Sequence, residues 1–361
     1  MRSLLSILLI SILVLSALPA QAQVKNVIIL VSDNEADLTL AEKIGELIQA
    51  KVVVTPWGIY NESVSAEIAE KNPSLVLIIG GPKAVSPQYE EDFQSLGISY
   101  VRRWGETRVE TAISVIKFLK KDYPWLFKNA KLALVYGWDL AGIHKVRELM
   151  KRENVIPIYL SRNSSSVPIN WSGRFIVVET PFSAGIFKKI RIPNPIIVKA
   201  NVTKEITWDA IERAEKAIIR AKRIIELTDI PQEKRLEIAN RLLSKAKEAY
   251  STGDYIRAYN LANAARSIAD SIVSMGMFSK PRIRLPMKLQ IQMQLRLLKM
   301  LTMRLESQGI DVKPVKELIA KAEDALKRGD LNEAMKYLNE AKELIRQIHR
   351  GRVGWRGKGK P

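Results

Sequence analysis

Residues 75–111 read LVLIIGGPKAVSPQYEEDFQSLGISYVRRWGETRVET and form the most informative segment of the chain. The segment opens with a continuous apolar run, 75–79, which is typical of a strand covered on both faces of a sheet. Gly80-Gly81-Pro82 ends the run, because glycine and proline after an apolar segment mark a turn. A polar helical stretch, 89–96, and a second short strand, 99–102, follow. The segment therefore predicts one strand–helix–strand unit of a parallel sheet.

The same alternation extends over residues 24–200. The first set of expected elements consists of strands 27–31, 52–55, 75–79 and 99–102 and helices 38–48, 64–70, 89–96 and 110–121. A second set of the same order follows about one hundred residues later. It comprises strands 132–136, 156–160 and 175–178 and helix 143–150. We therefore predict an α/β fold with a duplicated, mostly parallel sandwich subdomain, divided into 23–125 and 126–200.

Several small and charged residues of the first set recur together in one known family. They are Gly80, Gly81, Val85, Ser86, Gly105, Arg108, Glu110 and Thr111. This combination resembles the cell-wall-binding repeat (type 2) of secreted bacterial and archaeal surface proteins. The second set has Glu179-Thr180-Pro181 in place of the double glycine and lacks the Gly-x-x-Arg patch, so it resembles a degenerate repeat. The resemblance implies a noncatalytic surface module that attaches to anionic cell-wall or surface polysaccharide.

Three arginines near Trp104 are the candidate polymer-binding residues. Arg102, Arg103 and Arg108 could hold an anionic sugar through charge and ring stacking. The turn after the strand would complete this surface with Gly80, Gly81 and Ser86. Two structural alternatives stand beside this prediction. Arg108 could pair with the neighbouring Glu106 or Glu110, and the glycines could serve only a tight turn.

Beyond a linker at 188–204 the apolar period becomes helical, which predicts an all-α helical-hairpin domain over 201–348. Two segments in it share one pattern, Thr252-Gly253-Asp254-Tyr255 and Arg328-Gly329-Asp330-Leu331. Glycine ends a helix and aspartate caps the next one, so each segment predicts the turn of a helical hairpin. This domain is expected to act as a spacer or as an interaction module for other envelope proteins.

The formal net charge of +19 is concentrated late in the chain. Up to residue 200 there are 24 Lys and Arg against 18 Asp and Glu, and afterwards 33 against 20. Positive charge favours polyanions, with simple solubility as the alternative. A basic stretch without acids, 279–304, could lie on an anionic membrane or be a core helix with a solvated face. The Gly, Arg and Lys-rich tail, 349–361, is expected to be disordered.

The front of the chain has the pattern of a signal peptide, 1–22. A basic start at Arg2 precedes an apolar core, 4–18, and a small-residue cleavage site ends at Ala22. A retained anchor is the alternative. The expected localisation is secreted or cell-surface, with acidic polysaccharide as partner, peripheral membrane contact and oligomerisation left open, and nucleic acid disfavoured.

Catalytic, metal and cofactor sites are not expected. The chain contains no Cys and only two histidines, His144 and His349, and no nucleophile–base motif. Acidic residues nevertheless follow the first strand of each set, at Asp33 with its neighbours Glu35 and Asp37, and at Asp139. Acids at the carboxyl ends of strands often face a ligand crevice. An extracytoplasmic solute-binding or assembly scaffold protein that uses this crevice is therefore the alternative function, and a hydrolase is disfavoured.

Four sequons fall in the α/β part and its linker. They begin at Asn61, Asn163, Asn170 and Asn201. N-glycosylation is expected at these positions only if the exporting organism modifies such sites.

Overall fold

The computed structural model describes residues 26–181, 183–228, 230–278 and 287–356, so the predicted signal peptide lies outside the described residues. Two four-stranded, wholly parallel sheets form the α/β part. Sheet A has the order β2-β1-β3-β4, and sheet B repeats this order as β6-β5-β7-β8. The strands are β1 (Val27–Ser32), β2 (Lys51–Thr55), β3 (Leu75–Ile79), β4 (Tyr100–Arg103), β5 (Lys131–Tyr136), β6 (Val155–Leu160), β7 (Phe175–Glu179) and β8 (Ile196–Lys199). The predicted duplication is confirmed.

Helices connect the strands, as is usual for parallel pairing, except between β6 and β7, where residues 161–174 form no helix. They are α2 (Glu35–Ile48), α3 (Glu62–Glu70), α4 (Gln88–Leu96), α5 (Arg108–Asp122), the 3₁₀ helix η1 (Pro124–Phe127), α6 (Leu140–Met150) and α7 (Ala184–Phe187). Strand β8 was missed by the sequence analysis, which assigned its residues to a linker. Its side chains are mostly exposed because it forms the edge of sheet B, so its short apolar run carries a weak signal.

Alternate residues of sheet A face two different cores, which follows from the two-residue period of a strand. Ile29 and Val31 belong to a core that continues into sheet B, while Ile28 and Leu30 belong to a second core. Because both faces are covered, β1 is buried along its whole length. The continuous apolar run in the sequence is the direct consequence.

Two groups of three helices complete the chain. The first contains α8 (Lys204–Thr228), α9 (Glu233–Ser251) and α10 (Tyr255–Phe278), and the second contains α11 (Met287–Glu306), α12 (Lys313–Arg328) and α13 (Leu331–Arg356). The predicted hairpin turns are confirmed. Gly253 and Gly329 have φ of 80° and 81°, and Asp254 and Asp330 cap the following helices.

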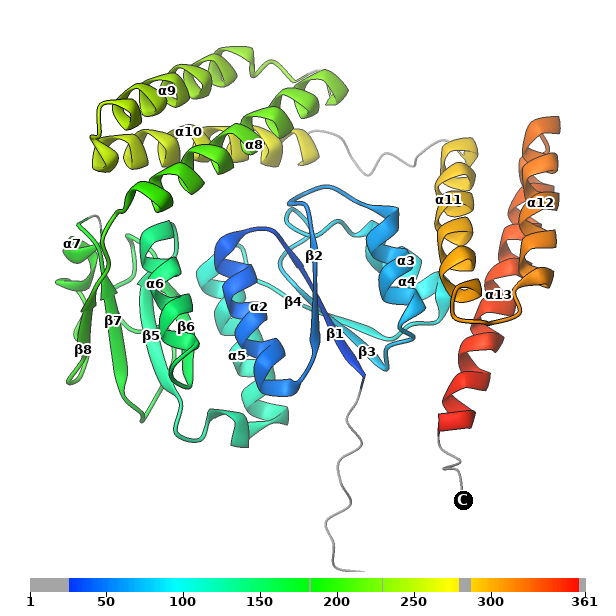
Figure 1. Ribbon diagram of the computed structural model, residues 1–361, viewed down its shortest axis with the longest axis horizontal. Coiled ribbons are helices and arrows are strands. Elements are labelled where there is room, and N and C mark those ends of the chain that lie inside the picture. Colours follow the sequence, from blue (N-terminus) through cyan, green and yellow to red (C-terminus); the bar gives the residue numbers. More distant parts are fainter. Residues whose placement is uncertain (1–25, 182, 229, 279–286, 357–361) are drawn as a thin grey trace, which may run out of the picture.

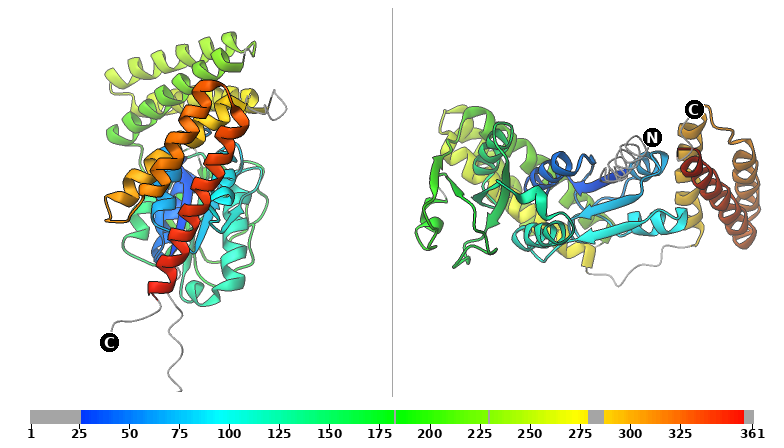
Figure 2. Two further views of the ribbon diagram at one scale, coloured as in Figure 1. Left: turned by 90° about the vertical axis from the view of Figure 1, so that its right-hand side faces the viewer. Right: turned by 90° about the horizontal axis from the view of Figure 1, so that it is seen from below.

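The two helical groups pack on different parts of the α/β body. Helices α8–α10 lie across the carboxyl ends of the strands and bury Leu140 and Ala141 at the start of α6 (Figure 1). Helices α11–α13 cover α3 and α4 on the outer side of sheet A, as the turned views show (Figure 2). Two separate packing sites within 201–348 were not apparent from the sequence, because both groups have similar apolar periods.

The described part of the basic stretch 279–304 is a core helix. The apolar side of α11 is buried against sheet A's helices, with Ile291 and Leu298 completely enclosed. On its polar side Arg304 pairs with Glu70 at 2.8 Å. Helix α13 continues to Arg356, so residues 349–356 are helical, which corrects the prediction of a disordered tail for that part. None of the described helices has the length and apolar character needed to cross a membrane.

Candidate functional site

The carboxyl ends of both sheets point toward α8 and α10. In sheet A, β1 is followed by Asp33, by Asn34 as the N-cap of α2, and by Glu35 in its first turn. In sheet B, Asp139 is the N-cap of α6 and follows β5 by three residues. The two acidic positions noted in the sequence therefore lie at equivalent places of the two halves, below the same helical group.

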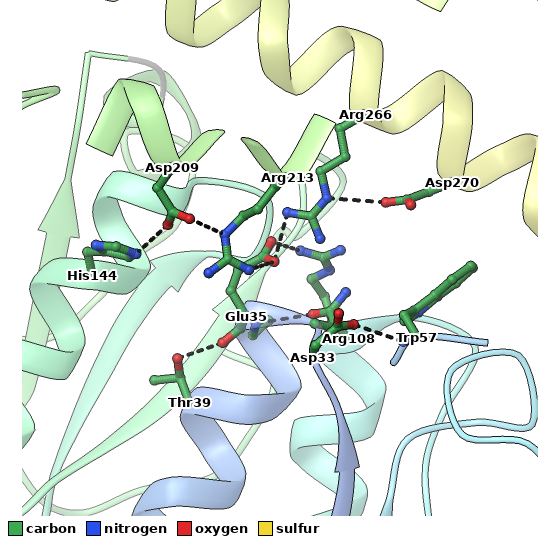
Figure 3. A network of polar contacts seen from close by, with 12 residues as sticks. Asp33, Glu35, Thr39, Trp57, Arg108, His144, Asp209, Arg213, Arg266 and Asp270 are labelled. Carbon is green, nitrogen blue, oxygen red and sulfur yellow. Dashed lines mark hydrogen bonds and ion pairs between the residues drawn. The ribbon is translucent and has the colours of Figure 1, made fainter. Parts of the chain in front are cut away.

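Glu35 is the centre of an ion-pair cluster that joins three parts of the molecule (Figure 3). Its carboxylate lies 2.8 Å from Nη1 of Arg266 on α10, 3.4 Å from Nη1 of Arg108 on α5, and 3.6 Å from Nη1 of Arg213 on α8. Burial alone would raise the pKa of Glu35, but the three guanidinium groups outweigh burial and lower it to about 2. Glu35 is therefore a fixed negative charge at neutral pH.

The cluster extends outward from Glu35 through further pairs. Arg220 of α8 lies 3.6 Å from both Asp33 and Asp270, and Asp270 also lies 3.3 Å from Nε of Arg266. We call Asp33, Glu35, Arg108, Arg213, Arg220, Arg266 and Asp270 the Glu35 cluster. Its members come from the loop after β1, from the starts of α2 and α5, and from α8 and α10, so it holds the helical group against the α/β body.

Sheet B has a different arrangement around Asp139. The carboxylate accepts hydrogen bonds from the Gly142 amide at 3.3 Å, the Tyr259 hydroxyl at 3.0 Å and the Thr180 hydroxyl. The same Tyr259 oxygen accepts from the Ala141 amide at 3.0 Å. Burial raises the pKa of Asp139, and these hydrogen bonds only partly oppose it. Tyr259 thus attaches α10 to the start of α6 without any ion pair.

Asp37, in the first turn of α2, is a buried acid with an incomplete set of partners. Among the described residues its Oδ1 has no hydrogen-bond partner. Burial raises its pKa to about 7, against the attraction of Arg108 and with a smaller repulsion from Glu35. The burial of Asp37 therefore lowers the stability of the fold at neutral pH. Asp37 lies near the carboxyl ends of the strands, where ligands of α/β folds commonly bind.

Beside the Glu35 cluster lies a cavity of about 620 Å³, here called the cleft. Its wall on the sheet B side includes the aromatic pair Tyr136 and Trp138, whose ring centres are 5.5 Å apart, and Arg108 stacks on the Trp138 ring at 4.9 Å. The lining residues are Glu35, Arg108, Tyr136, Trp138, Asp139, Arg162, Tyr259, Asn260, Asn263, Ala264, Arg266, Ser267, Asp270 and Ser271.

The cleft offers more donors than acceptors to a ligand. Glu35 and Asp139 already accept several hydrogen bonds or ion pairs, as described above. Arg162 and Asn260 are exposed, and within the described ranges no partner of either side chain is found. A guanidinium, a side-chain amide and an indole face are groups that bind anionic, hydroxyl-rich ligands by bidentate hydrogen bonds and stacking.

Of the predicted arginines, Arg108 lines the cleft. Its partner is Glu35, so neither Glu106 nor Glu110 holds it, and it also donates to the Gly137 carbonyl of sheet B. Glu110 instead forms a capping box with Thr107. The pairing with Glu35 could not be read from the sequence because the two residues belong to different elements.

The Arg102 side chain is occupied by contacts within the protein. It pairs with Glu90 at 2.8 Å and donates to the carbonyls of Gly80 and Val85 at 2.8 and 3.1 Å, with only 9% of its side chain exposed. Arg103 stacks on Phe118 at 4.2 Å. The three arginines of the predicted polymer-binding surface therefore have three separate environments, and the structure does not gather them into one patch.

Backbone geometry favours glycine at position 80, and close packing favours glycine at position 81. Gly80 has a φ of 119°, and a Cβ on Gly81 would lie 2.8 Å from Cε3 of Trp104. Ser86 accepts from the Gln88 amide at 3.3 Å at the start of α4. These observations support the tight-turn alternative for the two glycines.

The sequons are placed on different surfaces. Asn61 caps α3, accepting from the Ser63 amide at 2.9 Å, whereas Asn163, Asn170 and Asn201 are exposed. Their glycosylation stays a prediction. No group of three or more potential metal-ligating side chains is found within the described parts of the chain.

The sequence analysis missed the residues that α8 and α10 contribute, namely Arg213, Arg220, Arg266 and Asp270. They lie on the polar sides of amphipathic helices, where charged residues are expected in any case. The acids after the strands were the available signal for this place, and they led to the correct edge of the sheets.

Comparison with known proteins identifies no characterised family. No protein-family model matches the chain. A stretch of 151 residues is 34% identical to the uncharacterised protein MJ0755 of Methanocaldococcus jannaschii, covering 42% of this chain and 44% of that protein. The chain thus matches less than half the length of this relative. The solved structure of Cwp6 from Clostridium difficile superimposes with a TM-score of 0.35 and 19% identity, over 49% of this chain and 28% of that one.

Proposed function

We propose that the protein is an exported cell-surface protein that binds an acidic sugar unit of an envelope polymer in the cleft and leaves it chemically unchanged. The observation that carries this proposal is the composition of the cleft wall. Arg162, Asn260 and Asn263 present donors beside the exposed indole of Trp138. A sugar ring would stack on the indole, while its carboxylate would meet the guanidinium of Arg162.

The arrangement of the arginines around the cleft supports an anionic ligand. The only carboxylate in the lining with a strongly lowered pKa, Glu35, is surrounded by three guanidinium groups. Its negative charge is therefore compensated within the protein, and Arg162 adds a further positive charge at the rim. A ligand carboxylate would therefore pair with Arg162 rather than meet a general excess of positive charge, because the lining holds the acids Glu35, Asp139 and Asp270 against an equal number of arginines.

The ionisation and the hydrogen bonds of the carboxyl groups in the cleft lining favour binding over hydrolysis. Glycoside hydrolysis commonly needs two carboxyl groups facing the substrate, one of which holds a proton near neutral pH. Glu35 is held ionised, and Asp139 is engaged by a helix N-terminus and two hydroxyl groups. Neither of these side chains is free to move a proton to or from a bound sugar, and the third acid of the lining, Asp270, is paired with Arg220 and Arg266.

The test is calorimetric titration of the chain 23–361 with uronic-acid oligosaccharides and with their neutral counterparts. We expect binding of the acidic series only, weakening as salt is raised. Arg162→Ala should weaken it by about tenfold, the effect of losing one charge-assisted hydrogen bond. Arg241→Ala removes an equally exposed charge on α9, away from the cleft lining, and should leave affinity unchanged. Equal binding of neutral sugars would refute the proposal.

Export is a separate part of the proposal and rests on the signal-peptide pattern, 1–22. Cell fractionation should find the chain outside the cytoplasm, beginning near Gln23, and a high-salt wash should release it from the envelope. A cytosolic chain that keeps Met1 would contradict export, whatever the sugar titration shows.

The cleft volume favours one other function, that of a small-solute-binding protein. Cavities of about 300–1,000 Å³ commonly hold small molecules, and this one measures about 620 Å³. Thermal unfolding in the presence of free uronic acids and other small organic anions separates the two functions. A large rise of the unfolding temperature with a monosaccharide, and no further rise with the oligosaccharide, would favour the solute-binding function.

A further inference from the structure

The loops at the amino ends of the strands of sheet B lie on the far side of the molecule from the cleft. Backbone hydrogen bonds from Lys131 to the Asn154 carbonyl at 2.9 Å and from Leu132 to the Arg174 carbonyl at 3.1 Å bring three segments together. We call the exposed residues of 120–130, 151–154 and 172–174 the basic face. It is separate from the cleft lining.

Charge on the basic face is strongly one-sided. Its exposed basic residues are Lys120, Lys121, Lys128, Lys151, Arg152 and Arg174, and its acids are Asp122 and Glu153. Lys131 of β5 forms an ion pair with Glu153 and so compensates that acid. Within the described residues none of the six basic side chains forms an ion pair, so the excess of positive charge is not compensated locally.

An exposed aromatic residue lies among these lysines. Trp125, in η1, is 63% exposed and touches Tyr123 edge-on, with ring centres 5.4 Å apart. Nearby, Lys120 lies over the ring of the half-buried Trp171 at 5.5 Å. Tryptophan and tyrosine with lysine are the residues that prefer the boundary between lipid headgroups and acyl chains.

Both described ends of the chain lie on this side of the molecule. The carboxyl ends of both sheets face the cleft, so their amino ends, including Asn26 before β1, face away from it. Asn72, at the amino end of β3, donates to the His349 carbonyl at 3.1 Å, which places the end of α13 there as well (Figure 1). The sequence before Asn26 contains the apolar run 4–18, and the sequence after α13 contains two further lysines.

We propose that the basic face docks on an anionic lipid surface. The lysines would meet the headgroup charge, and the Trp125 ring would enter the interface between headgroups and acyl chains. The cleft would then point away from the membrane, toward the envelope polymer. A soluble polyanion would use the same charges, but it gives no reason for an exposed indole on the same face, so we favour the lipid surface.

The test uses the chain 23–361, which retains every described residue and lacks the apolar front segment. Co-sedimentation with phosphatidylglycerol-rich vesicles is compared with phosphatidylcholine vesicles at low salt. We expect binding to the first only. The triple variant Lys120→Gln, Lys121→Gln, Lys128→Gln should lower partitioning about 100-fold, since each charge near the surface contributes about fivefold.

Two controls make the result specific. The variant Lys222→Gln, Lys234→Gln, Lys245→Gln removes the same charge from exposed positions of α8 and α9 and should bind as the parent does. Quenching of tryptophan fluorescence by brominated lipid should be largely lost in Trp125→Phe. Equal losses in both triple variants would overturn the proposal. So would binding to soluble dextran sulfate that resembles vesicle binding and does not depend on Trp125.

Discussion

The two halves of the α/β body share a strand order but hold their first helices differently. In the sheet A half, the acid near the start of α2, Glu35, is surrounded by arginines and its pKa falls to about 2. In the sheet B half, Asp139 at the start of α6 is surrounded by hydroxyl groups, and burial raises its pKa. An acid at the start of the first helix of each half can therefore be stabilised by charge or by neutral hydrogen bonds, with opposite consequences for its titration.

The largest effect that tests this difference is expected from Glu35→Gln. The substitution leaves three partly buried guanidinium groups without the buried carboxylate that they share, which should destabilise the protein by about 3–5 kcal/mol. Denaturant unfolding measures this loss. Glu148→Gln on α6 removes an exposed carboxylate paired with Lys145 and should cost less than about 1 kcal/mol. A small loss for Glu35→Gln would mean that the cluster does not hold the helical group.

Acid unfolding follows from the same carboxylate. Because the folded pKa of Glu35 is lowered from 4.5 to about 2, its contribution is complete above pH 4.5 and is lost as pH falls toward 2. The wild-type protein should lose about 3 kcal/mol over this window through Glu35. The Glu35→Gln variant should lack this component when its stability is measured over the same pH range.

Asp37→Asn should change stability in the opposite direction. Its folded pKa is raised from 3.8 to about 7, so the folded state keeps a proton that the unfolded state has released. Stability therefore falls as pH rises from 3.8 to about 7, and the cost persists above that. The variant should be more stable than wild type by about 4 kcal/mol at pH 8 and close to it at pH 4. Equal gains at both pH values would contradict the titration of Asp37.

In the sheet B half, Tyr259→Phe is expected to have an intermediate effect. It removes the hydroxyl that donates to Asp139 and accepts from the Ala141 amide, both of which are buried. A loss of about 1–3 kcal/mol in urea unfolding is expected. Tyr337→Phe removes a hydroxyl that donates to Glu333 on α13, near solvent, and serves as the matched control with little change.

The smallest effect concerns the turns that follow β3 and β7. Gly81→Ala would place a Cβ against the Trp104 ring, which is 45% exposed and can move, so a loss of about 1 kcal/mol is expected. Near-ultraviolet circular dichroism should report the shifted indole. Gly185→Ala in α7, where no atom lies within 4 Å of the added Cβ, should leave both signals unchanged.

The strands and their duplication were predictable because a strand covered on both faces needs a continuous apolar run. The runs at β1, β3, β5 and β7 are of this kind, and the structure confirms them. Strand β8 was missed because it lies at an exposed edge, where packing imposes little on the sequence.

Part of the candidate site was also readable. The acids that follow β1 and β5 indicated the carboxyl ends of the strands as the place of the site. In a parallel sheet these ends all lie on one side. Arg102 and Arg103 were predicted to bind polymer on the strength of their charge and of the neighbouring Trp104. Charge alone does not distinguish an arginine that meets a ligand from one that satisfies Glu90 or stacks on Phe118.

By itself the sequence determined the parallel α/β halves, the helical hairpins and the capped turns, because these depend on local periodicity and on residues close along the chain. Only the tertiary structure decided that one helical group closes the cleft while the other covers the outer side of sheet A. It alone decided that Arg108 on α5, Arg213 on α8 and Arg266 on α10 meet at Glu35. Ion pairs between residues far apart in the sequence depend on how the packed surfaces fit together. The local sequence of an amphipathic helix does not determine which surface it packs on when several helices have similar compositions.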